Sequence, residues 1–381
     1  MITSRRTFLR FGAGAAATAA SWPLKAVAAP RRFEPARGTG SDGLIFLYSN
    51  ENAYGPSARV ADALRTAIES ANRYPRLHYS DLIDQIAGAH HVAPEHVLLG
   101  CGSTEILRMA AFAFAAQGKQ MVHASPTFEA IEHYSHAVGA KITAVPLTSG
   151  FAHDLDAMLA RANESSGLIY ICNPNNPTAS LSPRSDLENF IAKLPTSTVV
   201  LIDEAYHHYA GASGMYASFI DRPIDDERVI VARTFSKVYG LAGMRLGYAI
   251  ASPSLLQQMR TFSNEDNINA MVTAAASVAL SDTESTRDFI QRNANDRQEF
   301  FNQAMARALK PIDSHTNFVM MNTFHPAEEV IQHFRKNNIM IGRRFPPMET
   351  YIRVSLGRPE EMLAFWRVWD LLPFSKNIMH H

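Results

Sequence analysis

Seven short apolar segments, separated by longer stretches of helical length, do most to limit what this chain can fold into. The segments are residues 97–100, 120–124, 141–145, 168–172, 199–203, 229–232 and 247–251. The intervening stretches with helical character include residues 104–116, 128–138, 155–162 and 183–193. Strands that alternate with helices favour a largely parallel sheet covered by helices on both faces. We therefore expect an α/β fold.

The pattern changes after about residue 263. Two helix-prone stretches, 270–280 and 284–308, precede a short apolar run at 318–322, a helical stretch near 327–337 and a second run at 351–355. This order predicts a smaller α+β domain. A chain of 381 residues has room for two domains. We predict a large domain over residues 61–265, a small domain over 266–381, and an arm over 29–60, with a possible strand at 44–48, that contributes to the small domain.

The first 28 residues contain arginine and lysine but no Asp or Glu. Residues 4–10 have the sequence Ser-Arg-Arg-Thr-Phe-Leu-Arg, an Ala- and Gly-rich stretch follows, and residues 26–28 are Ala-Val-Ala. This order resembles a twin-arginine export signal with a small-residue cleavage site. The resemblance implies that residues 1–28 are a signal peptide and that the protein is periplasmic or otherwise exported by the twin-arginine machinery. That route carries folded proteins, often with a cofactor. Whether the signal is cleaved stays open.

Charge and cysteine content exclude several classes of function. The sequence has 36 Lys and Arg against 36 Asp and Glu, so we expect no nucleic-acid partner. Its two cysteines, Cys101 and Cys172, are too few for a four-cysteine zinc site or a disulfide scaffold, and we predict free buried thiols. The adjacent histidines at 90–91 and 207–208 do not have metal-ligand spacing, so we predict no metal site.

Four polar clusters follow the predicted strands. They are residues 100–105 (Gly-Cys-Gly-Ser-Thr-Glu), 173–178 (Asn-Pro-Asn-Asn-Pro-Thr), 203–206 (Asp-Glu-Ala-Tyr) and 234–237 (Thr-Phe-Ser-Lys), the last with Arg245 downstream. Ligands of open α/β sheets bind at these carboxyl ends. Glycines before a helix suit a phosphate, a buried Asp requires a cation, and a lysine supplies a nucleophilic amine. Each cluster alone is also typical of a cap, a turn or a surface residue, but four together predict one site.

With these clusters, the chain resembles the fold type I pyridoxal-phosphate aminotransferases of class I/II, in particular the histidinol-phosphate aminotransferase-like branch. Further matching motifs are residues 49–56 (Ser-Asn-Glu-Asn-Ala-Tyr-Gly-Pro), 72–75 (Asn-Arg-Tyr-Pro), 126–128 (Pro-Thr-Phe) and 351–354 (Tyr-Ile-Arg-Val). They run in family order from about Leu47 to Gly357. The resemblance implies an aspartate aminotransferase-like fold and pyridoxal phosphate as cofactor.

The resemblance also implies a role for each matching residue. Lys237 bonds to the cofactor and moves a proton, Asp203 pairs with the ring nitrogen, and Tyr206 completes the catalytic set. Asn176 joins Tyr206 at the ring oxygen, and Phe128 stacks on the ring. The phosphate would be bound by Gly102, Ser103, Thr104, Thr234, Ser236 and Arg245. Tyr74 would reach the phosphate of a neighbouring subunit in a homodimer. Arg353 would bind the substrate carboxylate, and Tyr54 is a further substrate-binding candidate.

The implied reaction moves an amino group between an amino acid, or a histidinol-phosphate-like amine, and a 2-oxo acid by a ping-pong mechanism. Two alternatives stay open: a decarboxylase or lyase of the same fold, and a non-catalytic protein that binds pyridoxal phosphate. The sequence departs from the family at Ala53, where Pro is usual, and at Ala179, where Gly is usual. Arg343 and Arg344 precede Phe345 near the region where relatives contact the distal end of substrate, so recognition of a phosphorylated side chain stays open.

Overall fold

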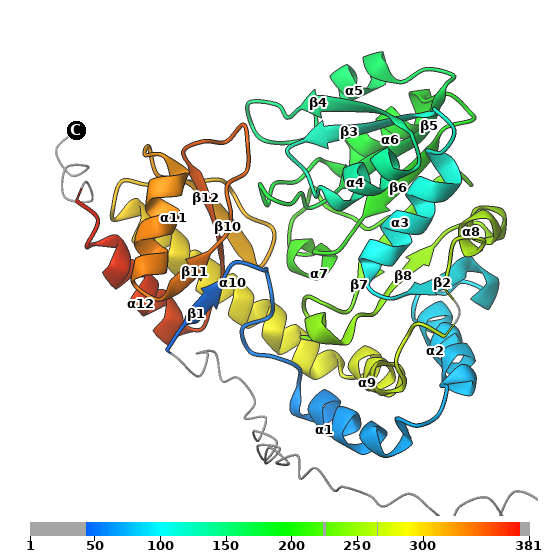
Figure 1. Ribbon diagram of the computed structural model, residues 1–381, viewed down its shortest axis with the longest axis horizontal. Helices are drawn as coiled ribbons and strands as arrows, with labels where there is room; N and C mark the ends of the chain where they lie inside the picture. Colours follow the sequence, from blue (N-terminus) through cyan, green and yellow to red (C-terminus); the bar gives the residue numbers. More distant parts are fainter. Residues whose placement is uncertain (1–42, 224–225, 265, 374–381) are drawn as a thin grey trace, which may run out of the picture. The chain divides into compact units, whose positions relative to one another are not determined.

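The largest sheet of the computed structural model has seven strands in the order β2-β8-β7-β6-β5-β3-β4 (Figure 1). The structure describes residues 43–223, 226–264 and 266–373. The strands are β2 (Val97–Gly100), β3 (Gln120–Ser125), β4 (Lys141–Pro146), β5 (Ser166–Cys172), β6 (Val199–Asp203), β7 (Val229–Thr234) and β8 (Gly247–Ile250). β8 runs antiparallel to both of its neighbours, and the pairs among β7, β6, β5, β3 and β4 are parallel. The prediction of a mostly parallel sheet is confirmed.

Helices cover both faces of this sheet, which gives the domain two separate cores. Along β5 the buried side chains alternate: Leu168 and Tyr170 belong to one core, and Ile169 and Ile171 to the other. The first core includes residues of α3 (Ser103–Phe114), α4 (Ala130–Ala137) and α8 (Pro253–Arg260). The second includes residues of α1 (Ala58–Ala67), α2 (Arg76–Ala89), α5 (Leu155–Arg161), α6 (Arg184–Lys193) and α9 (Ala270–Ser281).

Short elements complete the large domain. They are the four-residue helix α7 (His207–Ala210) and the 3-10 turns η1 (Ile68–Ser70), η2 (Pro94–His96) and η3 (Ala242–Met244). α7 directly follows the loop after β6, and η3 follows the loop after β7. Both therefore begin near the carboxyl ends of the central strands.

A third core belongs to the smaller α+β part of the chain. Its elements are α10 (Thr283–Met305), β9 (Lys310–Pro311), β10 (Phe318–Asn322), α11 (Ala327–Lys336), β11 (Ile339–Ile341), β12 (Tyr351–Ser355) and α12 (Pro359–Trp369). β12, β10 and β9 form an antiparallel sheet, and β1 (Ile45–Leu47) pairs in parallel with β11 (Figure 1). Large aromatic side chains from α10, α11 and α12 fill this core. The prediction of a smaller α+β domain is confirmed.

The contacts of α9 bear on the predicted domain boundary at residue 265. Val272 and Ala275 of α9 lie in the same core as Val60 of α1 and Leu82 of α2, on one face of the large sheet. These contacts favour a boundary near Asp282, between α9 and α10, and the boundaries themselves stay a prediction. The composition of α9 indicates that the helix is buried but does not indicate which core covers it.

The predicted signal peptide, residues 1–28, lies outside the described residues, as does the arm up to residue 42. Within the described ranges, no helix has the length and apolar character needed to cross a membrane.

Candidate functional site

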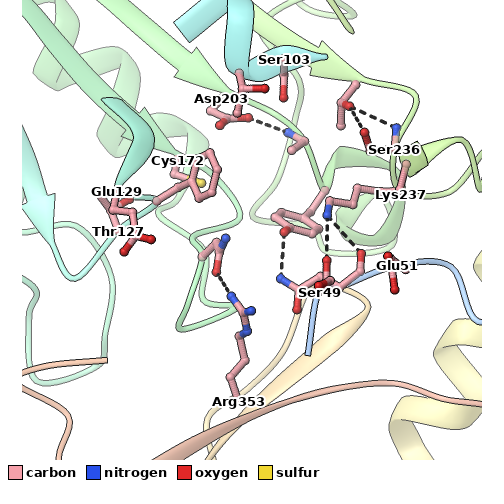
Figure 2. A pocket seen from close by; sticks show the side chains of 18 of the residues that line it. Ser49, Glu51, Ser103, Thr127, Glu129, Cys172, Asp203, Ser236, Lys237 and Arg353 are labelled. Atoms are coloured by element: carbon pink, nitrogen blue, oxygen red, sulfur yellow. Dashed lines mark hydrogen bonds between the residues drawn. The ribbon is translucent and has the colours of Figure 1, made fainter. Parts of the chain in front are cut away.

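A cavity of about 470 Å³ opens at the carboxyl ends of β5, β6 and β7. Figure 2 shows Asp203, Lys237 and Arg353 entering it from three separate segments. The lining residues also include these predicted site residues: Ser103, Thr104, Phe128, Asn176, Tyr206, Thr234, Ser236 and Arg245. The structure therefore brings together predicted site residues that are up to 250 positions apart in the sequence, from Ser103 to Arg353.

One wall of the cavity is a cradle of hydroxyl groups and one guanidinium group at the start of α3. Arg245 donates from Nη2 to Thr104 Oγ1 at 3.2 Å and from Nη1 to Ser236 Oγ at 3.4 Å. The hydroxyl of Thr234 donates to Ser236 Oγ at 2.9 Å. A positive group, several hydroxyls and the unpaired amides of a helix start form a chemically suitable phosphate site.

Two glycines let the backbone approach this cradle closely. Gly102 has a φ of +77°, and a Cβ built there would lie 2.2 Å from Arg245 Nη2. A Cβ on Gly247 of β8 would lie 2.3 Å from the Ser103 nitrogen. Side chains at either position would occupy the space that the phosphate loop and Arg245 need. Gly102 does not line the cavity directly, but it shapes the predicted phosphate site.

Asp203 ends β6 and is 3% exposed. Its Oδ2 accepts a hydrogen bond from the Tyr170 hydroxyl at 2.9 Å, and its Oδ1 accepts from the Ala205 nitrogen at 3.1 Å. Burial raises the pKa of Asp203 to about 6, against the opposite effect of these two hydrogen bonds. A buried carboxylate in this position fits the protonated nitrogen of a pyridine ring. Tyr170 was not predicted for the site, because it lies inside an apolar strand.

Lys237 follows β7 and extends into the cavity, where its Nζ donates to the Asn50 carbonyl at 3.1 Å and the Ser49 carbonyl at 3.4 Å (Figure 2). Burial lowers the pKa of Lys237 to about 8, and the charge of Arg353 acts in the same direction. A substantial fraction of this amine is therefore neutral near pH 8. The neutral form is the one that attacks a carbonyl carbon.

Arg353 projects from β12 and is 9% exposed. It donates from Nη1 to Asn176 Oδ1 and from Nη2 to the Tyr48 carbonyl, each at 2.6 Å, while its buried Nε has no hydrogen-bond partner among the described residues. Burial lowers the pKa of Arg353 to about 10, so the guanidinium keeps its charge at neutral pH. A buried cation with an unpaired donor suits an incoming carboxylate.

Besides Gly102, two predicted residues, Tyr54 and Tyr74, lie outside the cavity lining. The Tyr54 hydroxyl donates to Asp296 Oδ2 at 2.8 Å, and its ring stacks on Phe289 of α10 with centroids 6.5 Å apart. The Tyr54 hydroxyl is thus bonded outside the lining of this cavity, and its contact with substrate stays a prediction. Tyr74 is 74% exposed and lies outside the lining. Its predicted role requires a second subunit.

Sequence reasoning missed several lining residues, among them Asn50, Glu129 and Arg343. Asn50 lies in the motif at residues 49–56 but was given no role, and Arg343 was placed near the distal end of substrate without being predicted to line the cavity. Arg343 forms an ion pair with Glu129, and both residues line the cavity. Both cysteines are free, with Cys172 buried at the lining and Cys101 only partly buried, so the predicted burial of Cys101 is wrong. Cys101 is more open because it lies in the loop before α3 rather than in a strand.

The paired histidines after Tyr206 lie behind the cavity. Burial lowers the pKa of His208 to about 3, and burial likewise lowers that of His207, so both rings are neutral at physiological pH. His208 Nε2 lies 3.2 Å from the Tyr239 hydroxyl. Over the described residues, no group of three His, Cys, Asp or Glu side chains is arranged to hold a metal ion.

A seven-stranded sheet with this strand order, carrying a lysine and a phosphate cradle at its carboxyl edge, is typical of the pyridoxal-phosphate enzymes built like aspartate aminotransferase. Sequence comparison identifies the family. The aminotransferase class I and II profile matches residues 42–365, and the chain belongs to this family. The protein is a pyridoxal-phosphate-dependent aminotransferase.

Named relatives agree with this assignment. The chain is 33% identical over 330 residues to a histidinol-phosphate aminotransferase of Bacillus cytotoxicus, covering 86% of this chain and 88% of the relative. It is 33% identical over 334 residues to the enzyme of that name from Caldicellulosiruptor saccharolyticus, covering 87% and 92%. The structure is also similar to the crystal structure of histidinol-phosphate aminotransferase from Sinorhizobium meliloti in complex with pyridoxal-5'-phosphate, with a TM-score of 0.81, 28% identity, and coverage of 88% and 91%.

Proposed function

We propose that this aminotransferase moves an amino group between an amino acid, or a phosphorylated amine such as histidinol phosphate, and a 2-oxo acid. The observation that carries the proposal is the meeting of Lys237, Asp203 and Arg353 in one cavity. Bound pyridoxal phosphate supplies an electron sink for negative charge at the substrate Cα. The roles of the surrounding side chains follow from their chemistry and position.

The cofactor phosphate would be held in the cradle of Ser103, Thr104, Thr234, Ser236 and Arg245, shaped by Gly102. Asp203 would accept the hydrogen of the ring nitrogen and keep that nitrogen protonated, because a buried carboxylate is stabilised by a neighbouring cation. Phe128, which lies at the cavity wall, would pack against the ring, and Asn176 and Tyr206 would donate to the ring oxygen. These placements orient the ring without requiring movement of the sheet.

Lys237 would bind the cofactor covalently and then take and return the proton at the substrate Cα. Its Nζ has the pKa, about 8, of a group that can accept and release a proton near neutral pH. Arg353 would bind the substrate α-carboxylate with two parallel hydrogen bonds. Its anchoring by Asn176 and Tyr48 fixes the guanidinium plane before substrate arrives.

The experiment that tests the function is a substrate panel on the purified protein loaded with pyridoxal phosphate. We expect amino donors to change the visible absorbance of the bound cofactor and a 2-oxo acid to restore it. Histidinol phosphate belongs in the panel because the named relatives are histidinol-phosphate aminotransferases. A panel in which no donor changes the spectrum would contradict the proposal. Release of carbon dioxide without a keto product would instead indicate a decarboxylase.

We also propose a homodimer in which Tyr74 contacts the phosphate of the partner's cofactor. The support is an aromatic side chain that is 74% exposed and lies outside its own cavity. Mixed dimers test it: Lys237→Ala and Tyr74→Ala variants, unfolded together and refolded, should regain one competent site per hybrid. Failure to regain activity, with a dimer present by light scattering, would show that Tyr74 does not act across subunits.

Finally, we propose that residues 1–28 direct export through the twin-arginine pathway and that the enzyme works in the periplasm or outside the cell. The support is the order of the arginine pair, the apolar stretch and the Ala-Val-Ala site in the sequence. Cell fractionation should find the enzyme outside the cytoplasm. A variant with Arg5→Lys and Arg6→Lys should stay inside, and unchanged export of that variant would refute the route.

A further inference from the structure

Asn50 lies between the two domains and bonds to both. It is 2% exposed, and its Nδ2 donates to the hydroxyl oxygen of Tyr206 at 3.0 Å. On the other side, the Ser355 hydroxyl donates to Asn50 Oδ1 at 3.1 Å and accepts from the Asn50 main-chain nitrogen at 2.8 Å. The Asn50 carbonyl accepts from Lys237 Nζ at 3.1 Å. One buried residue therefore joins Tyr206 and Lys237 to β12.

The backbone holds Asn50 in this place. Its φ is +54°, in the left-handed region that Asn tolerates better than most residues with a Cβ. Asn317 Nδ2 donates to the carbonyls of Asn50 and Glu51, each at 3.0 Å. A backbone conformation of this kind persists only where several contacts fix it. Here Asn317 and Ser355 of the small domain supply those contacts together with Lys237 of the large domain.

The direction of these hydrogen bonds determines what the Tyr206 hydroxyl can do. Ser355 gives its hydrogen to Oδ1, which orients the Asn50 amide with its nitrogen toward Tyr206. The Tyr206 oxygen then serves as an acceptor for Asn50, so its single hydrogen is available for another partner. Tyr206 lines the cavity and packs edge-on against Phe318, with ring centroids 5.2 Å apart.

We propose that Asn50 is a positioning residue that turns the hydroxyl hydrogen of Tyr206 toward the ring oxygen of the bound cofactor, with Ser355 fixing the Asn50 amide. The inference rests on the proposed function, in which Tyr206 meets that ring oxygen. Ser355 is two residues after Arg353 on β12, so both side chains leave the same face of the strand. The strand that binds the substrate carboxylate would thus also orient a group at the cofactor.

The charges around Tyr206 are compatible with this role. Lys237 Nζ lies 5.4 Å from the centre of its ring, and Arg353, Asp203 and Cys172 also act on its hydroxyl. Burial raises the pKa of Tyr206 above its ordinary value, so the phenol stays protonated at working pH. It therefore keeps a hydrogen to donate.

The test is the pH midpoint of the visible absorbance of the cofactor-loaded protein. A hydrogen bond donated to the ring oxygen stabilises negative charge on that oxygen. It therefore lowers the pKa of the neighbouring Lys237 nitrogen where that nitrogen is bonded to the cofactor. Asn50→Gly keeps the left-handed backbone but removes the amide, and Ser355→Ala removes the hydroxyl that orients it. Each should raise the midpoint by about half a pH unit, the size expected for one weakened hydrogen bond.

Two controls make the result specific. In a Tyr206→Phe background, Asn50→Gly should leave the midpoint unchanged, because the group that Asn50 positions is gone. Thr198→Val removes a buried hydroxyl that donates to the Ser166 carbonyl at 2.9 Å, beside the end of β6 opposite Asp203, and should also leave it unchanged. If Asn50→Gly does not fold, Ser355→Ala decides by the same measurement.

An unchanged midpoint in Asn50→Gly or in a folded Ser355→Ala would overturn the proposal. So would an equal shift with and without the Tyr206 hydroxyl. Failure of the proposed function has a different signature: no amino donor would then change the visible absorbance of the wild-type protein loaded with pyridoxal phosphate. A donor-dependent change in that absorbance, with an unmoved midpoint in the Asn50 variant, removes only the positioning role.

Discussion

A buried ion pair behind the cavity offers the sharpest test of how the site is held. Glu204 directly follows Asp203, and Arg233 directly precedes Thr234. Their side chains are 1% and 4% exposed, and Arg233 donates from Nε and Nη2 to the same Glu204 oxygen at 3.1 and 3.0 Å. The pair thus ties together the ends of β6 and β7, from which Asp203 and Lys237 reach the cavity.

Replacing Arg233 with Met would leave the Glu204 carboxylate buried with two donors from the described part of the chain. These are the Ser218 hydroxyl at 2.6 Å and the Phe219 nitrogen at 2.8 Å. Breaking a buried pair by removing one partner costs about 3–5 kcal/mol, because the remaining charge has no counter-charge. We expect the free energy of unfolding to fall by this amount. The double variant Glu204→Gln with Arg233→Met should recover at least half, since the carboxylate charge is gone.

Urea unfolding of the cofactor-free variants, followed by circular dichroism, measures these differences from the midpoint and slope. Arg65→Met is the matched control, because Arg65 and Asp62 form an ion pair with side chains 73% and 74% exposed, and no measurable change is expected. A loss below about 1 kcal/mol in Arg233→Met, or a double variant that is no more stable than Arg233→Met, would refute the reasoning.

Three further outcomes follow from the cavity. Burial, with a contribution from Arg353, lowers the pKa of Lys237 to about 8. The rate at which cofactor-free protein binds pyridoxal phosphate covalently should therefore rise about tenfold per pH unit below pH 8 and level off above it. Visible absorbance follows this rate. Gly247→Ala should raise the cofactor Kd at least tenfold in an equilibrium titration, since its Cβ would lie 2.3 Å from the Ser103 nitrogen; an unchanged Kd would mean that the loop shifts freely. Arg353→Lys should raise the KM for carboxylate substrates about tenfold or more, because lysine cannot form the two parallel bonds; equal KM values would remove the proposed contact.

The parts of the fold that depend on local pattern could be predicted from the sequence. The apolar runs from 97–100 to 247–251 all form strands, because β-rich apolar segments bounded by turns leave few other solutions. The direction of β8 could not be predicted, because an apolar run does not indicate which neighbours it pairs with. β11 has only three residues, too few for any periodicity to mark it.

The site divides in the same way. Polar groups after strands were predictable, because the carboxyl ends of parallel strands meet at one edge. Contacts made by a side chain within a strand, such as Tyr170 with Asp203, depend on the register between β5 and β6. The pairing of Tyr54 with Asp296 was equally hidden, since it depends on where α10 lies. Tertiary placement determined these contacts.

The pairing of β1 with β11, and the bond from Asn50 to Ser355, fix an order of events during synthesis. Asn50 and Ser355 are 305 positions apart, so the first segment of the cavity must wait until almost all of the chain has left the ribosome. Until then, Tyr206 and Lys237 lack the partner that spans the domains. A fragment that ends before Ser355 therefore lacks this closure, and we expect it to bind the cofactor more weakly than the full sequence. For a protein that we propose is exported folded, loading the cofactor would mark the molecules ready to leave.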